Sequence, residues 1–237
     1  MNKRDTNRAP ALLALVGFSA LAAASAPALG GGGPPPPSNN VCASAKGVWG
    51  SQISLTLDGV LPWTTTFVGE IVMTRGTMHP GDHPGLQGEF VAYCAELDQD
   101  LHTGVEDCWV PAPVHVAPTS SGGMGLTAAA LVRELYGRFY AGLDTADQKA
   151  AFQVAIWELI YDPGHDVLHG GFRVAGNPAV SGLAQAYLNS LNGNPDHRDP
   201  RVFALVNNCV QDLLVVPTPG TLALLALGGV VMARRRR

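Results

Sequence analysis

Apolar and polar residues alternate along the first half of the chain, and this period of two predicts β-strands. The alternation over 53–57 stops at Asp58-Gly59, a dipeptide typical of a tight hairpin turn. β-Branched and apolar residues then fill 64–73, and a further alternating stretch follows at 88–97. We therefore expect a hairpin followed by a third strand.

After residue 125 the apolar positions recur at a helical period instead. Three helices are expected. The first is capped by Thr127 and has an apolar stripe of Leu131, Leu135 and Phe139. The second is opened by a capping box of Thr145 and Gln148 and ends near Tyr161, and the third runs from Pro178 to a stop at Gly193.

Strand-like composition returns at 201–206 and 211–216. Strands that flank a run of helices, without alternation of single strands and helices, predict an α+β fold. We expect β-sandwich or barrel-like strands with an inserted helical subdomain.

The first 40 residues have the layout of an export signal and a linker. A basic start is followed by an apolar stretch at 11–24 and by Ala26-Pro27-Ala28, a typical cleavage motif of secretory signal peptides. We therefore assign 1–28 to a signal peptide. The Gly and Pro runs of 29–40 are typical of a linker, which leaves 41–216 as the folded body.

The C-terminal segment 217–237 has a different composition from the body. Pro217-Thr218-Pro219-Gly220 precedes a short apolar stretch and four terminal arginines. A helix over 221–233 would be about 20 Å long, shorter than the roughly 30 Å hydrocarbon core of a bilayer. This layout predicts a transient membrane insertion rather than a permanent span.

The segment resembles the PEP-CTERM sorting signal, which exosortases cleave in Gram-negative bacteria, although Thr218 stands where the usual motif has Glu. The resemblance implies an exported protein of the cell surface or extracellular matrix of a Gram-negative-type bacterium. It also implies an exosortase-type enzyme as a processing partner.

The charge of the body excludes one class of partner. Seven of the 15 Lys and Arg residues but only one of the 19 Asp and Glu residues lie in the two terminal segments, so the body has a net charge of −10. Such an acidic surface argues against nucleic acid as a partner.

The chain has four cysteines, Cys42, Cys94, Cys108 and Cys209. In an exported protein the simplest expectation is two disulfides, for which three pairings exist. Two short motifs change this expectation for Cys94. One is the pair Tyr93-Cys94 in a predicted strand, and the other lies in the second predicted helix: Phe152-Gln153-Val154-Ala155-Ile156-Trp157.

Together and in this order, the two motifs resemble those of the bacterial Cys-Gln thioester domain, known from surface adhesins. The resemblance covers roughly 41–216 and implies an intramolecular thioester between Cys94 and Gln153. An amine or hydroxyl of an unidentified protein or glycan would then attack the Gln153 carbonyl and become covalently attached. With Cys94 in the thioester, we expect a disulfide between Cys42 and Cys209.

The residues around Gln153 are consistent with this chemistry. Gln153 shares a helix face with Ile156 and Trp157, so its amide needs a polar partner in an apolar environment. A hydrogen-bonded core glutamine is the simpler interpretation. In the reactive interpretation, the Cys94 thiolate attacks the Gln153 carbonyl and expels ammonia, while Tyr93 and Trp157 keep water out.

We therefore expect an adhesion or anchoring protein that reacts once and is not an enzyme. The alternatives are a disulfide-stapled matrix or structural protein without a reactive bond, and a secreted cysteine hydrolase. No cofactor is expected. His165 and His169 have the spacing of a zinc-binding helix, but the Glu of that motif is missing and the preceding Pro163-Gly164 makes a helix unfavourable. Asp98 begins a segment like a calcium loop that lacks the later carboxylates, so no metal is expected either.

Overall fold

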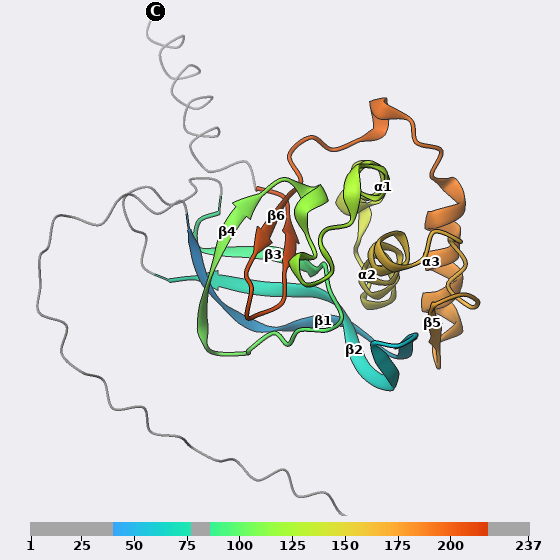
Figure 1. The fold of residues 1–237 in the computed structure, drawn as a ribbon, viewed down its shortest axis with the longest axis horizontal. Helices are drawn as coiled ribbons and strands as arrows, with labels where there is room; N and C mark the ends of the chain where they lie inside the picture. Colours follow the sequence, from blue (N-terminus) through green and yellow to red (C-terminus); the bar gives the residue numbers. More distant parts are fainter. Residues whose placement is uncertain (1–39, 77–85, 218–237) are drawn as a thin grey trace, which may run out of the picture. The chain divides into compact units, whose positions relative to one another are not determined.

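A computed structural model describes residues 40–76 and 86–217 of the protein (Figure 1). The predicted signal peptide, nearly all of the predicted linker and the sorting motif after Pro217 lie outside the described residues.

The fold is α+β, as expected, and its strands form one antiparallel sheet. The strands are β1 (Val41–Leu57), β2 (Leu61–Arg75), β3 (Glu89–Cys94), β4 (Glu106–Ala112), β5 (Phe172–Ala175), β6 (Phe203–Val206) and β7 (Leu213–Val215). Their order is β2-β3-β7-β6-β4-β1-β5, and β1 also pairs with β2. This additional pairing closes six of the strands into a ring, with β5 attached to the end of β1.

The long β1–β2 hairpin confirms the turn predicted at Asp58-Gly59. Gly59 has a φ of 75°, the left-handed conformation that such a turn requires. Farther along the hairpin, a Cβ on Gly50 would lie only 1.8 Å from the carbonyl oxygen of Val68. Glycine is therefore required for the two backbones to approach at this point.

The helices are α1 (Gly125–Phe139), α2 (Ala146–Tyr161) and α3 (Pro178–Ser190). Figure 1 shows them gathered on one side of the sheet, and α2 packs on α3, β1 and β2. None of the helices in the described ranges combines the length and the hydropathy needed to cross a membrane.

Two of the predicted helix starts are confirmed. Thr145 Oγ1 accepts a hydrogen bond from the N–H of Gln148, whose side chain bonds back to the Thr145 N–H. This is the predicted capping box, and it opens α2. Pro178 occupies the first turn of α3, where Asn177 provides the cap.

Two helix boundaries and three strands differ from the sequence prediction. Thr127 is not a cap, because α1 already begins at Gly125. Gly193 is not the stop of α3, which ends at Ser190. The whole of β4 and β5 was not predicted, because their partners in the sheet lie far away in the sequence. The first part of β1, which continues the hairpin with β2, was not predicted either.

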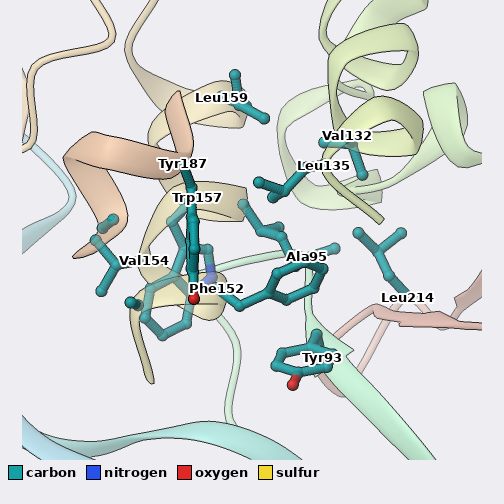
Figure 2. Close-up of a cluster of buried hydrophobic side chains, with 14 of the residues drawn as sticks. Tyr93, Ala95, Val132, Leu135, Phe152, Val154, Trp157, Leu159, Tyr187 and Leu214 are labelled. Atoms are coloured by element: carbon teal, nitrogen blue, oxygen red, sulfur yellow. The ribbon is translucent and has the colours of Figure 1, made fainter. Parts of the chain in front are cut away.

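Two apolar clusters make up the core. The larger lies between the sheet and the helices and includes Tyr93, Phe152 and Trp157 (Figure 2). The smaller cluster is formed by strands of the ring and includes Met73 and Trp109.

The predicted disulfide between Cys42 and Cys209 is wrong. Cys42 is bonded to Cys108, which lies directly opposite it in the β1–β4 ladder with a Cα–Cα distance of 4.0 Å. Cys209 is an exposed free thiol, and Cys94 is a free thiol as well. Spacing along the chain carries no information on this pairing, because strand register decides which cysteines face each other.

Candidate functional site

The fold brings Cys94 and Gln153 together, although 59 positions separate them in the sequence. Gln153 Oε1 accepts a hydrogen bond from the Cys94 N–H at 2.7 Å, and Gln153 Nε2 donates one to the Cys94 carbonyl at 2.8 Å. The Gln153 side chain is only 1% exposed. Its carboxamide is therefore held by the backbone of the cysteine with which it was predicted to react.

The two residues meet because one strand ends where one helix packs. Cys94 is the last residue of β3 and pairs with Leu213 of β7. Gln153 lies in the second turn of α2, one turn after Lys149. The Lys149 ammonium contacts Glu70 of β2 at 2.6 Å and lies 3.7 Å from the centre of the Trp49 ring. These contacts attach the first half of α2 to the β1–β2 hairpin.

A second carboxamide, which the sequence analysis missed, faces the thiol. Cys94 Sγ donates to Gln211 Oε1 at 2.9 Å, and Gln211 Nε2 donates to the Glu96 carbonyl at 2.6 Å. The Glu96 carbonyl fixes the orientation of the Gln211 amide, because only the NH₂ group can donate to it. The thiol thus rests against Gln211, while Gln153 is bound to the backbone of Cys94. No local pattern around Gln211 distinguishes it from an ordinary loop residue.

The surroundings of the thiol are acidic. Glu96 and Asp212 are both fully buried, and Glu96 Oε1 accepts from the Asp212 N–H at 2.6 Å. Ser120 Oγ donates to Glu96 Oε2 at 2.6 Å. Burial raises the pKa of Glu96 and of Asp212 above their ordinary values.

The same environment keeps the thiol protonated. Burial, and secondly the charge of Glu96, raise the pKa of Cys94 well above its ordinary value. The free thiol is therefore a poor nucleophile at neutral pH and becomes more reactive as the pH rises.

The residues that flank the two motifs lie in the larger cluster. Tyr93 is 1% exposed and meets Phe152 edge-on, with 4.9 Å between the ring centres. Trp157 is 5% exposed and packs against Phe172. Ala155 and Ile156 are fully buried. Figure 2 shows the rings of Tyr93, Phe152 and Trp157 in this one cluster. The aromatic residues of both motifs are thus core residues.

The remaining sequence candidates are not among the residues that contact Cys94 and Gln153 in the described ranges. Cys42 is in the disulfide, Cys209 is exposed, and Thr218, Pro219 and Gly220 lie outside the described residues. Within residues 40–76 and 86–217, no group of three or more His, Cys, Asp or Glu side chains could hold a metal ion.

The chain was compared with protein-family models, curated proteins and solved structures, and none of them matches it.

Proposed function

We propose that the protein is an exported surface protein that attaches covalently to a partner through a thioester between Cys94 and Gln153. The observation that carries the proposal is the pair of reciprocal hydrogen bonds between the Gln153 carboxamide and the Cys94 backbone. A core glutamine needs only some polar partner, whereas Gln153 is bound to the cysteine whose thiol would form the thioester with it.

The hydrogen bonds also favour the chemistry. The Cys94 N–H donates to the Gln153 oxygen, so it would stabilise the negative charge that develops on this oxygen during attack. The Cys94 Sγ–Gln153 Cδ bond forms and the Cδ–Nε2 bond breaks. The thiol proton leaves with Nε2 as ammonia, so the reaction needs no further reagent.

Sγ has to leave Gln211 before it can attack. A rotation of the Cys94 side chain moves the sulfur away from Gln211 Oε1, while the backbone that holds Gln153 stays in place. Since the pKa of the thiol is raised, we expect thioester formation to accelerate by about tenfold per pH unit through the neutral range.

Burial would then preserve the product. Water reaches an acyl group slowly when the group lies among closely packed aromatic residues such as Tyr93 and Trp157. A partner amine or hydroxyl that gains access would attack the Gln153 carbonyl, form an amide or ester and release the Cys94 thiol.

Intact-mass measurement tests the proposal on folded protein that no amine has contacted. The mass should be one ammonia below the sequence mass, after allowance for the Cys42–Cys108 disulfide. Methylamine should add one amine at Gln153 and free the Cys94 thiol. The variants Cys94→Ala and Gln153→Glu should show neither the deficit nor the adduct. Wild-type protein without the ammonia loss would refute the proposal.

A disulfide-stapled structural protein is the second candidate, and the cross-strand Cys42–Cys108 bond favours it. This candidate predicts the full mass and no reaction with methylamine. For a cysteine hydrolase, the described residues offer no histidine at the thiol: its hydrogen-bond partner is Gln211, and the charge that raises its pKa is that of Glu96.

The proposed location outside the cell rests on the sequence of the two terminal segments. The disulfide is compatible with it, because such bonds persist in oxidising compartments.

A further inference from the structure

A pocket of about 640 Å³ lies along α1, away from the residues that contact Cys94 and Gln153. Its volume is in the range of pockets that bind small molecules. Three segments form it: the turn after β4, the first half of α1, and the loop after α3. The lining consists of seven apolar residues, Pro113, Val114, Leu126, Ala129, Ala130, Pro195 and Pro200, and three basic ones, His115, Arg133 and Arg198.

The two arginines differ from the other basic residues of the body. Five of the eight Lys and Arg residues between the terminal segments form ion pairs: Lys46–Glu89, Arg138–Glu134, Lys149–Glu70, Arg173–Asp58 and Arg201–Asp199. Arg75 donates to two backbone carbonyls. Arg133 and Arg198, by contrast, form no ion pair with a carboxylate in the described ranges, and both line this pocket.

The donors of these arginines are largely unused. The Arg133 guanidinium makes no hydrogen bond to a described residue. Arg198 donates one bond to the Gly193 carbonyl at 2.8 Å, whereas its Nε is buried without a partner. Hydrogen bonds from Arg201 lower the pKa of Asp199, and the charge of Arg133 contributes, but Arg201 occupies both carboxylate oxygens of Asp199, at 3.0 and 2.7 Å.

A body with a net charge of −10 should easily provide carboxylates for two arginines. Arg133 and Arg198 are both half-buried, and Arg198 Nε is fully buried without an acceptor, so an anion bound in the hollow would satisfy a donor that is otherwise costly to leave unpaired. Guanidinium groups match carboxylates in shape and charge. The proline, alanine and leucine side chains offer an apolar wall for the remainder of a ligand.

We propose that this pocket binds an organic carboxylate with an apolar body, held by Arg133 and Arg198. The same chemistry is found in a free carboxylic acid and in the C-terminal carboxylate of a peptide. A second hollow of about 330 Å³ shares Leu126, Ala130 and Arg198 with the pocket, so an elongated ligand can extend past Arg198. The proposal does not depend on the thioester, since it uses neither Cys94 nor Gln153.

The test is an NMR titration of the isotopically labelled full chain with 4-phenylbutanoate, and with the neutral 4-phenylbutanamide as its control. The carboxylate should bind saturably and shift the amide signals of Ala129 and Ala130, and the amide should not. A second arm uses a short peptide that ends in leucine, with a free or an amidated C-terminus. Binding of the peptide acid alone would identify a chain terminus as the ligand, and binding of both acids would identify the carboxylate group itself.

Three variants test the role of the arginines. Arg133→Gln and Arg198→Gln should each weaken binding by about tenfold or more, the effect of losing a charge-assisted hydrogen bond. Arg173→Gln, at an arginine paired with Asp58, should bind like the wild type. Arg133→Gln removes no hydrogen bond within the described residues, so this variant should fold normally. Equal binding of an acid and its amide, no saturable shift at Ala129 and Ala130 with either acid, or unchanged affinity in the folded Arg133→Gln variant would each overturn the proposal.

Discussion

The ammonium of Lys149 lies 2.6 Å from Glu70 Oε2, one helical turn before Gln153. Lys149 is 5% and Glu70 9% exposed, so the pair is almost completely removed from water. It connects α2 to β2 at the end of the helix that carries Gln153. The pair thus joins the turn of α2 that precedes Gln153 to the β1–β2 hairpin.

Removing one partner of the pair should destabilise the protein strongly. Lys149→Met leaves the Glu70 carboxylate buried without a counter-charge, and we expect it to lower the free energy of unfolding by about 3–5 kcal/mol. Denaturant unfolding measures this change. The double variant Lys149→Met, Glu70→Leu should recover most of the loss, because no unpaired charge remains.

The exposed pair of Lys46 and Glu89 provides the control. Lys46→Met should change the stability by less than about 1 kcal/mol, as is usual for pairs in water. If Lys149→Met has an equally small effect, the buried pair does not anchor α2.

Gln211 should hold the resting thiol without forming the thioester itself. In Gln211→Met the side chain keeps its length but loses the acceptor for the Cys94 S–H. Because Gln153 is untouched, we expect the mass deficit of one ammonia to persist and the methylamine adduct to remain on Gln153. The variant should lose about 1–3 kcal/mol of stability, since the Glu96 carbonyl loses its donor.

Peptide mapping of the adduct decides between the two glutamines. An adduct on Gln211 in the wild type would show that the thiol reacts with the carboxamide it touches, contrary to our assignment. Loss of the mass deficit in folded Gln211→Met would likewise indicate that Gln211 supplies the acyl group of the thioester.

The disulfide should contribute most of its stability through the unfolded chain. Cys42 and Cys108 are 66 positions apart, and closing a loop of this length corresponds to about 4 kcal/mol in the chain-entropy model. Cys108→Ser should therefore lower the unfolding free energy by several kcal/mol, whereas Cys209→Ser should leave it nearly unchanged. Peptide mapping without reduction should recover Cys42 linked to Cys108; recovery of a link to Cys209 would contradict the structure.

The stability of the protein should also depend on Glu158 of α2. Its side chain is fully buried, and burial followed by the charge of Asp162 raises its pKa from 4.5 to about 8. The folded state therefore binds a proton that the unfolded state releases between these two pH values. It follows that this group's contribution to stability falls as the pH rises from about 4.5 to 8, by at most about 1.4 kcal/mol per pH unit.

Glu158→Gln keeps the shape of the protonated side chain and removes the titration. Unfolding free energies measured at pH 5 and pH 8 should differ less in this variant than in the wild type, and the variant should be the more stable protein at pH 8. An identical pH dependence in both proteins would contradict a raised pKa at this position.

Several features of the protein could be predicted from the sequence because neighbouring residues produce them. Thr145 and Gln148 bond to each other across one helical turn, and Asp58-Gly59 needs only its own backbone to make a turn. Pro178 likewise starts α3 by its own ring geometry. The pairing of Cys94 with Gln153 was accessible through the resemblance of two short motifs, each of which is local.

Only the tertiary structure decided the features that depend on distant partners. β4 and β5 lack a clear alternation and exist because β1 pairs with them. Strand register placed Cys42 opposite Cys108, which no spacing indicates. Gln211 reaches the thiol from the loop before β7, 117 positions along the chain. Arg133 and Arg198 meet at one pocket because α1 packs beside the loop after α3. Each of these relationships is a contact between segments far apart in the chain. Such contacts form only when folding closes the long loops between the segments, and the conformational preferences of neighbouring residues do not indicate them.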